Sequence, residues 1–234
     1  MVDDPIKQQK SADATTVAIA LLASQGYETT TVEELADAAQ ISRSTFFRRF
    51  GSKEDVVFAD HDYLLERLTA YLQAASGDPL EALRHGARIV LDHHLSRREA
   101  SLTRHELLQH NPMLRDRELV SSHRYERAFA TYLYSVVPGA SERSWAITAL
   151  SAGIVSVHND MLRAWLKRAE IPAANVLDTQ LGSLCSLFRP VLFPDQDKRA
   201  MSSRVVVAVF DGEIDPENIL ARIQSAIEGT VKAH

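Results

Sequence analysis

The chain has 234 residues, of which 45% are hydrophobic and 24% charged, and its formal net charge is −5. This composition is typical of a folded globular protein with one large or two small domains. The single cysteine, Cys185, excludes an intramolecular disulfide framework and suits a reducing compartment. No apolar run approaches the roughly 20 residues of a membrane span, and none resembles a secretory signal, so we expect a cytoplasmic protein with no membrane partner.

The first part of the chain predicts a series of short helices. Apolar residues at helical spacing predict a first helix that ends near Gly26. Thr31 and Glu34 form a capping-box pattern, which predicts a second helix to about Ala39. Ser42 is a suitable N-cap for a third helix, which follows after a tight turn.

Residues 31–50 therefore predict a helix-turn-helix, and the charges along it change sign. The charged residues of 28–41 are all acidic, whereas residues 42–53 carry four cations and three phenylalanines with no carboxylate. Phe46 and Phe50 would face a small core and leave the arginines on the outer side, where DNA phosphates neutralise them. A solvated basic helix of a bundle is the alternative, but the caps, the turn and the charge switch together favour DNA binding.

Residues 14–57, about a fifth of the chain, resemble the DNA-binding region of the TetR family of transcriptional regulators. The resemblance has no gap, and Gln40 and Phe47 depart from the turn glycine and the recognition-helix tyrosine that are usual in the family. The matching residues are Gly26-Tyr27, Thr30-Thr31-Val32, Leu35-Ala36, Ala39, Ile41-Ser42, Thr45 and Phe50-Gly51-Ser52-Lys53-Glu54.

The resemblance implies an all-α fold and a homodimer that binds double-stranded DNA. It implies phosphate contacts from Thr31 and Lys53, and we expect Arg48 and Arg49 to replace the anchoring of the missing tyrosine hydroxyl. A two-fold dimer reads half-sites about 34–36 Å apart, so we expect a pseudo-palindromic operator. The other candidates for DNA contact are Ser42, Arg43, Ser44, Thr45 and Phe47.

Helical periodicity continues through the larger remainder of the chain. A fourth helix is predicted from Ser52 to Gly77, and prolines and glycines divide the later helices. In the family an effector shifts this fourth helix, so the segment 52–71 is expected to link the two domains mechanically. We predict a DNA-binding domain in 1–52, a helical effector-binding and dimerisation domain in 53–192, and a C-terminal extension in 193–234.

A helix predicted over about 141–167 is apolar on two faces, so both faces must be buried. One face would pack on the chain's own core and the other on a second copy, as the family's last two core helices do. A central helix in a monomeric core is the alternative. The predicted interface residues are Ala152, Gly153, Val155, Leu162, Leu166, Leu177, Leu181, Leu184 and Phe188.

His158 and Asn159 interrupt this apolar helix, where an unpaired polar group is unfavourable. They either line a pocket for a small, mostly apolar effector or form hydrogen bonds across the dimer interface, and the sequence leaves both open. Each further pocket candidate is alternatively an ordinary core residue. The pocket candidates are His94, Arg104, His105, Tyr125, Tyr132, Trp145, His158, Asn159 and Trp165.

No sequence motif supports an enzymatic function. The histidines do not share helical faces at metal-binding spacing, no HExxH pattern or cysteine cluster is present, and no nucleophile elbow occurs. We therefore expect no catalytic residue, no metal and no cofactor. A helical enzyme with an incidental helix-turn-helix, and a DNA-binding dimer without an effector, are the rival interpretations.

The extension contains a possible strand at 204–210 and a helix at 216–229. A lone strand leaves its backbone groups unpaired, so it needs a partner. Antiparallel pairing with its copy across the dimer axis and irregular packing on the bundle are both open.

Overall fold

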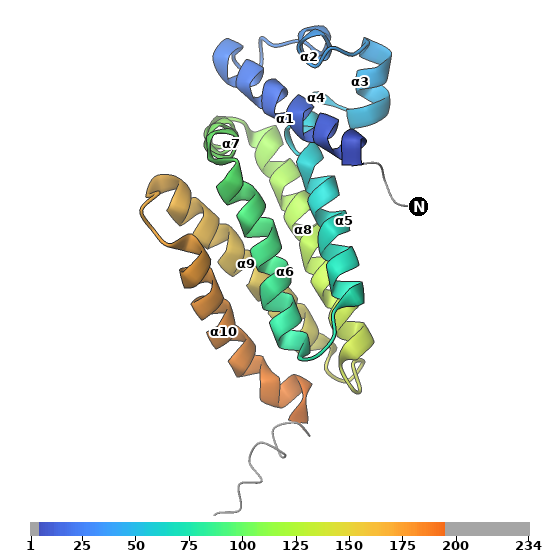
Figure 1. The fold of residues 1–234 in the computed structure, drawn as a ribbon, viewed down its shortest axis with the longest axis vertical. Helices are drawn as coiled ribbons and strands as arrows, with labels where there is room; N and C mark the ends of the chain where they lie inside the picture. The colour runs from blue at the N-terminus through green and yellow to red at the C-terminus, as the bar shows by residue number, and fades with distance from the viewer. Residues whose placement is uncertain (1–4, 195–234) are drawn as a thin grey trace, which may run out of the picture. The chain divides into compact units, whose positions relative to one another are not determined.

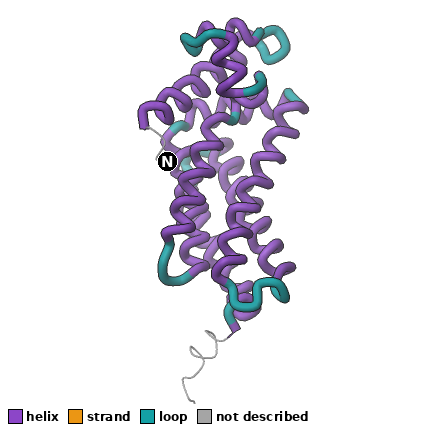
Figure 2. Tube along the Cα trace, turned by 90° about the vertical axis from the view of Figure 1, so that its right-hand side faces the viewer, coloured by secondary structure: helices purple, strands orange, loops and turns teal. Residues whose placement is uncertain are grey.

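The structure is a computed structural model that describes residues 5–194, with side chains from Ala14 onward. Within that range it is all-α, which confirms the predicted fold class, and its loops join helices that run mostly along the long axis of the molecule (Figure 2). The predicted strand at 204–210 and helix at 216–229 lie outside the described residues. The helices are α1 (Pro5–Gln25), α2 (Val32–Ala38), α3 (Arg43–Phe50), α4 (Lys53–Val57), α5 (Ala59–Ala74), α6 (Pro79–Ser96), α7 (Arg98–His110), α8 (Pro112–Val136), α9 (Ser144–Lys167) and α10 (Ala173–Leu192).

Local signals place the first helix ends where the sequence predicts them. Gly26, with φ of 93°, follows the end of α1. Thr31 caps α2 in a complete capping box, because its hydroxyl accepts from the Glu34 backbone N–H and the Glu34 carboxylate accepts from the Thr31 N–H at 2.7 Å. Ser42 caps α3 in the same way, accepting a hydrogen bond from the Thr45 N–H at 3.2 Å.

The first four helices enclose a small hydrophobic core. Phe46 is fully buried there, and its ring lies edge-on to that of Phe50 with centroids 5.1 Å apart. Leu107 and Leu108 of α7 and Leu114 of α8 complete the core. The helix-turn-helix is therefore packed directly onto the helical bundle below it (Figure 1).

The predicted fourth helix is divided in two at Phe58. Phe58 has φ of −115° and ψ of 12°, outside helical values, and separates α4 from α5. Its side chain is buried in the small core, which lets the chain turn from the helix-turn-helix into the bundle. α5 ends at Ala74, before Gly77 with φ of 93°.

A larger core fills the bundle of α5, α6, α8, α9 and α10, with α9 packed between α8 and α10. Arg143, just before α9, donates to the carbonyl of Val191 at 2.8 Å, so α9 and α10 run antiparallel. The predicted domain boundary after residue 52 does not separate the two cores, because Val56, Val57 and Phe58 still belong to the small one. That boundary remains a prediction.

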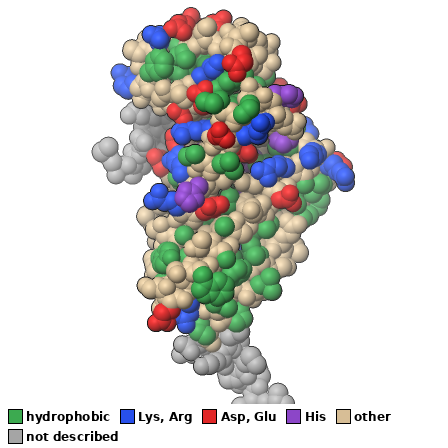
Figure 3. Space-filling model, turned by 180° about the vertical axis from the view of Figure 1, so that it is seen from behind, with side chains coloured by type: hydrophobic (Ala, Val, Ile, Leu, Met, Phe, Trp, Pro, Cys, Tyr) green, Lys and Arg blue, Asp and Glu red, His purple; other side chains and the backbone are tan. Residues whose placement is uncertain are grey.

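Charges on the surface are mixed in sign. On the face seen in Figure 3, basic and acidic side chains lie interspersed across the middle of the molecule, and apolar side chains gather below them. Arg124 of α8 pairs with Asp62 of α5 at 2.5 Å, and such pairing limits any long-range field from the bundle. Among residues 5–194, none of the helices combines the length and apolarity that crossing a membrane requires.

Candidate nucleic-acid interface and cavity

The outer side of α3 combines cationic, hydroxyl and aromatic side chains. Arg43, Ser44, Phe47 and Arg48 are all exposed, whereas Phe46 and Phe50 on the opposite side are buried. We call these four exposed residues the α3 surface. Phe47 is 41% exposed, its ring lies edge-on to that of the buried Phe46, and the Arg43 guanidinium lies 5.2 Å from its ring centre. An aromatic side chain held at a surface by cation–π contact is suited to touch a partner.

Arg43 occupies the first turn of α3, where the helix dipole is positive and a cation is unfavourable. Glu33 of α2 offsets part of that repulsion through a 2.6 Å ion pair, but both side chains are more than half exposed. An anion approaching the helix N-terminus would meet backbone N–H groups and arginine together. This end of α3 can therefore bind a phosphate.

The turn before α3 places Gln40 in the left-handed region, with φ of 55°. Gln40 therefore adopts the backbone for which the resemblance led us to expect glycine. The N–H of Ile41 donates to the Ala36 carbonyl at 2.9 Å and closes the end of α2. The hydrogen bond and the buried apolar residues around it hold the angle between α2 and α3.

Thr31 and Lys53, the predicted phosphate contacts, both have partners within the chain. The Thr31 hydroxyl donates to the Glu34 carboxylate at 2.8 Å. The Lys53 ammonium donates to the Tyr27 carbonyl at 2.7 Å and to the Thr30 carbonyl at 3.3 Å, and lies 4.2 Å from the centre of the Tyr27 ring. Lys53 thus ties the loop after α1 to the start of α4, and one of its three donors remains for a further contact.

Thr45 and Arg49 differ from the residues of the α3 surface. Thr45 is half-buried and accepts a hydrogen bond from the Ser42 hydroxyl at 2.9 Å. The Arg49 guanidinium lies 5.1 Å from the ring centre of Phe50, and partial burial lowers its pKa from the ordinary value. Ser42 is exposed, and its hydroxyl contacts the hydroxyl of Ser44 at the start of α3.

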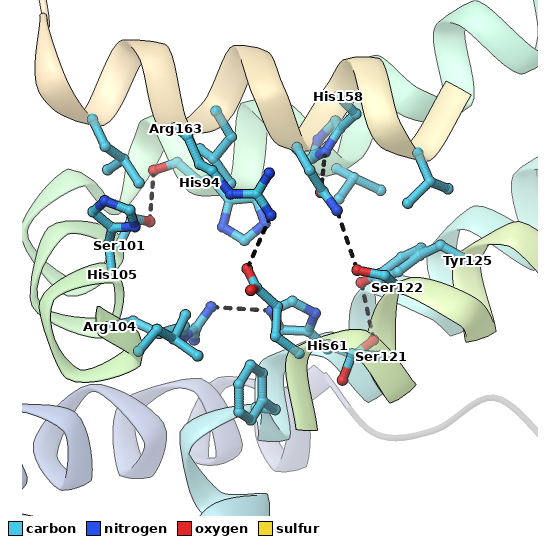
Figure 4. A pocket seen from close by; sticks show the side chains of 18 of the residues that line it. His61, His94, Ser101, Arg104, His105, Ser121, Ser122, Tyr125, His158 and Arg163 are labelled. Atoms are coloured by element: carbon cyan, nitrogen blue, oxygen red, sulfur yellow. Dashed lines mark hydrogen bonds and ion pairs between the residues drawn. The ribbon is translucent and has the colours of Figure 1, made fainter. Parts of the chain in front are cut away.

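A cavity lies inside the bundle, between the start of α5 and helices α6 to α9 (Figure 4). Its volume is about 70 Å³, so it has room for several waters. Six of the nine predicted pocket residues line it: His94, Arg104, His105, Tyr125, His158 and Asn159.

The structure places the other three candidates elsewhere. Tyr132 lines a separate, open hollow between α5 and α8. Trp145 is 62% exposed near the start of α9. Trp165 packs in the large core, with the Arg98 guanidinium 5.7 Å from its ring centre. All three are aromatic, and sequence spacing cannot distinguish an aromatic core residue from one that lines a cavity.

The polar side of the cavity rests on a buried ion pair. Arg104 of α7 donates to the Asp60 carboxylate of α5 at 2.7 Å, and both side chains are less than a tenth exposed. His93 contacts the other carboxylate oxygen at 3.2 Å. Burial raises the pKa of Asp60, but Arg104 and the His93 hydrogen bond outweigh it and hold that pKa well below its usual value. Asp60 therefore stays charged.

Three histidine side chains, His61, His94 and His158, line the cavity. The ring centre of His94 lies 5.7 Å from that of His61 and 6.2 Å from that of His158. Burial lowers the pKa of all three rings, to about 4 for His61, and Arg104 opposes protonation of His61 and His94 as a nearby cation. The three rings are therefore neutral near neutral pH.

Helix α9 supplies the far side of the cavity. The His158 ring contacts the Asn159 side-chain oxygen through Nδ1 at 3.2 Å, and the Asn159 amide donates to the Ser122 hydroxyl of α8 at 3.1 Å. Both residues thus line a space within one chain. Whether they take part in ligand binding or a dimer interface remains a prediction.

The predicted interface residues fall into four groups. Val155, Leu162 and Leu166 line the cavity, and Leu177 and Leu181 are buried in the chain's own core without a second copy. Gly153 faces α10, since an added Cβ would lie 3.2 Å from Leu184. Ala152, Leu184 and Phe188 are partly exposed on α9 and α10. One apolar face of α9 is therefore buried within the chain, where it packs against α8 and lines the cavity.

Sequence reasoning missed several residues that line the cavity. Phe58 and His61 come from the start of α5, and Ser101 and Ser121 come from α7 and α8. The Asp60-His61 pair was visible as adjacent ligand-type residues, but nothing in the sequence shows that both side chains are turned inward. No three His, Cys, Asp or Glu side chains within residues 5–194 are grouped so that they could hold a metal ion.

A capped helix-turn-helix on an all-helical bundle that encloses a cavity is the architecture of a helix-turn-helix regulatory protein. Residues 14–59 match the family described as "Bacterial regulatory proteins, tetR family". This segment of the chain, which contains the helix-turn-helix, is therefore similar to that family.

One curated relative is similar to part of the chain, and the fold is similar to solved structures. The chain is 41% identical over 76 residues to the HTH-type transcriptional regulator TcmR of Streptomyces glaucescens, a match that covers 32% of this chain and 34% of that one. The match thus spans about a third of the curated relative's length. The fold is similar to native NalD of Pseudomonas aeruginosa, the secondary repressor of the MexAB-OprM multidrug efflux pump, with a TM-score of 0.51 and 18% identity over 80% of this chain and 99% of that one. It is also similar to a transcriptional regulator of Rhodococcus sp. Rha1, with a TM-score of 0.50 and 16% identity over 79% and 96% of the two chains.

Proposed function

We propose that this chain is a homodimeric, sequence-specific DNA-binding transcriptional regulator, a repressor that a small, mostly apolar effector releases from DNA. The observation that carries the proposal is the α3 surface, where Arg43, Ser44, Phe47 and Arg48 face solvent on a helix whose other side is buried. The name of TcmR and the description of NalD as a repressor support the same function.

On DNA, α3 would enter the major groove with its N-terminal residues toward the base edges. Arg43 is then positioned for a bidentate contact with guanine, the commonest specific contact of arginine with a base. Ser44 can bond to a base edge or a phosphate, and Arg48 and Arg49 reach the backbone. The phosphate contacts make the affinity fall with salt, by a slope of about 0.9 in log–log form for each phosphate neutralised.

A salt-titrated gel shift on the DNA upstream of the chain's own gene tests this proposal. Arg43→Ala should weaken binding by about 1–3 kcal/mol if it reads a base, and should reduce the salt slope by about 1 if it contacts a phosphate. Arg127→Ala is the matched control, because Arg127 is exposed on α8 in the bundle. Equal effects of the two substitutions, or no binding at low salt, would refute the DNA interface.

The homodimer would form through α9 and α10. Trp145 of α9 and Leu187 of α10 are 62% and 75% exposed, and the antiparallel pairing of the two helices brings these residues to the same end. Ala149 and Ala152 continue the exposed side of α9 with small side chains, which permit close approach of a second helix pair. Two such pairs form a four-helix bundle.

Effector release needs a connection between the cavity and α3. Phe58 supplies one, because it lines the cavity and is also buried in the small core of the helix-turn-helix. A ligand that displaces Phe58 or His61 at the start of α5 would shift the segment 52–71 and change the spacing of the two α3 helices. The ligand must bind that altered spacing better than the DNA-competent one, or it shifts nothing. A dimer that binds DNA but no small molecule would remove this part of the proposal.

A further inference from the structure

The chemistry of the cavity restricts its ligand, and this inference rests on the proposed function of the cavity as an effector site. We infer that the effector is an uncharged, mostly apolar molecule that carries both a hydroxyl group and a carbonyl group. The inference depends on which polar atoms of the cavity lack partners and on how the charges around it are balanced.

The hydrogen-bond partners of His61 decide where its proton lies. Its Nε2 contacts an Arg104 N–H at 3.1 Å, and arginine only donates, so Nε2 accepts. A neutral imidazole then carries its proton on Nδ1. This Nδ1 is out of contact with solvent and has no hydrogen-bond partner among the described residues. His61 therefore offers a buried donor that is not yet used.

His158 offers the complementary group. Its Nδ1 faces the Asn159 side-chain oxygen at 3.2 Å, while the Asn159 amide is used on Ser122. The oxygen accepts, so the proton of His158 lies on Nδ1 and leaves a lone pair on Nε2. This Nε2 is buried as well, with no partner in the described part of the chain. His158 thus presents an unused acceptor in a side chain that is 7% exposed.

A buried polar atom without a hydrogen-bond partner is unfavourable, so a ligand that supplies the missing partner binds more tightly than one that does not. A carbonyl oxygen can accept from His61 Nδ1, and Arg104 Nε is a second buried donor without a partner among the described residues. A hydroxyl can donate to His158 Nε2. The His94 ring lies near both histidines, with its centre 5.7 Å from that of His61 and 6.2 Å from that of His158, so the two groups of the ligand bind at different histidines of one cavity.

The charges around the cavity cancel, which disfavours an ionic ligand. Arg104 is paired with Asp60 at 2.7 Å, and Arg163 at the rim lies 3.9 Å from Glu118 (Figure 4). The three imidazoles carry no charge near neutral pH. An anionic ligand would be desolvated without gaining an unpaired cation, and a cationic ligand without gaining an unpaired anion. The remaining lining is mostly apolar or aromatic, including Phe58, Tyr125 and Phe129, with three serine hydroxyls among it.

Four benzophenone derivatives of nearly equal length test the inference by calorimetry on the full chain without DNA. The first, 4-(hydroxymethyl)benzophenone, carries both groups. The second, 4-methylbenzophenone, lacks the hydroxyl, and the third, 4-benzylbenzyl alcohol, lacks the carbonyl. The fourth, 4-benzoylbenzoate, is an anion. We expect the first to bind about tenfold or more tightly than the second and third, and the anion not to bind measurably.

Substitutions then assign the preference to particular atoms. In His158→Leu the ratio of affinities between the first and second compounds should fall to about one, whatever the absolute affinities become. His123→Leu, on the exposed side of α8, should keep the wild-type ratio. Asp60→Asn leaves Arg104 uncompensated and should gain measurable affinity for 4-benzoylbenzoate. Should His158→Leu fail to fold, nitrogen NMR of the wild-type chain still reports the tautomers, and we expect the Nδ1–H form at His61 and His158.

Several outcomes would overturn the inference. These are equal affinity for the three uncharged compounds, preferential binding of the anion, no binding of 4-(hydroxymethyl)benzophenone at millimolar concentration, or an Nε2–H tautomer at His158. The gel shift is independent of these measurements. Selective ligand binding without DNA binding would refute the proposed function and leave the ligand class intact. DNA binding without ligand selectivity would refute the ligand class and leave the DNA-binding function intact.

Discussion

At the turn between α2 and α3, Gln40 holds a left-handed backbone with φ of 55°. This conformation is unfavourable for a residue with a Cβ, by about 1–2 kcal/mol, whereas glycine adopts it freely. The hydrogen bond from Ile41 to Ala36 and the packing of Leu35 and Phe46 hold the turn despite that penalty. The position of α3 is therefore set by packing and not by the intrinsic preference of its turn residue.

We predict that Gln40→Gly raises the free energy of unfolding by about 0.5–1 kcal/mol, because relief of the strain exceeds the extra entropy of the unfolded chain. Urea denaturation measures the change. The matched control is Gln73→Gly, since Gln73 is also exposed but has helical backbone in α5, and there glycine should lower stability by up to about 1 kcal/mol. Equal effects of the two changes would contradict the strain at residue 40.

The buried histidines make stability depend on pH. The folded-state pKa of His61, about 4, lies below its ordinary 6.5, because burial disfavours the protonated ring and Arg104 and His93 repel it, while Asp60 opposes the shift. The unfolded chain therefore takes up protons first as pH falls. The pKa values of His94 and His158 are lowered in the same direction.

We predict that the free energy of unfolding falls as pH is lowered from 6.5 toward 4, by up to about 1.4 kcal/mol per pH unit for each of the three rings. The pKa values of Asp60, Glu34 and Glu54 are also lowered, but from ordinary values of 3.8 and 4.5, so these carboxylates contribute at the acid end of the range and the slope just below pH 6.5 belongs to the histidines. Urea titrations across the pH range measure the slope. His158→Leu should make it shallower and His123→Leu should not, and parallel curves for all three proteins would refute the assignment.

Helices α5 and α6 approach each other closely at Gly86. A Cβ at this position would lie 2.7 Å from Leu68 Cδ1 and 3.4 Å from the Phe129 ring. Leu68 is fully buried and Phe129 is 2% exposed, so Leu68 has no free space into which to turn. The absence of a side chain at residue 86 thus sets the separation of two helices that flank the cavity.

Gly86→Ala should therefore lower the free energy of unfolding by about 1 kcal/mol or more, because overpacking outweighs the better helix propensity of alanine. Gly182→Ala in α10 is the control, since its Cβ would lie 3.6 Å from Arg84, an ordinary contact. That substitution should be neutral or raise stability by up to about 1 kcal/mol. Thermal denaturation of the pair measures the difference, and a stabilised Gly86→Ala variant would contradict the tight approach.

The break at Phe58 shows how one residue joins two elements. In an uninterrupted helix from 52 to 77, Phe58 would lie on one side of that single helix. The observed turn instead buries the ring in the small core while α5 continues into the bundle as a new helix. Helical periodicity on both sides of Phe58 is compatible with either arrangement, so the sequence pattern could not reveal the break.

For the whole molecule, the proposed dimer makes a direct prediction. Leu187→Arg should shift the chain from dimer to monomer at micromolar concentration, because a charge would be buried without a partner in the four-helix bundle. Leu119→Arg on α8 is the matched control, since Leu119 is 68% exposed and lies outside α9 and α10. Sedimentation or light scattering measures the mass. A dimeric Leu187→Arg variant, or a monomeric wild-type chain, would contradict this interface.

The sequence by itself determined the all-α class and most of the helix ends, because caps such as Thr31, Ser42 and Asp78 act through neighbouring backbone groups. It also determined that α3 exposes cations and buries Phe46 and Phe50, since period and charge are local properties of the chain.

Only the tertiary structure decided which polar residues share a site. Asp60 and Arg104 meet from different helices, and so do His94 and His158. The same packing made Leu177 and Leu181 core residues and left Leu187 exposed. Such outcomes depend on contacts between segments far apart in the chain, and the periodicity of one helix says which side is apolar but not what covers it.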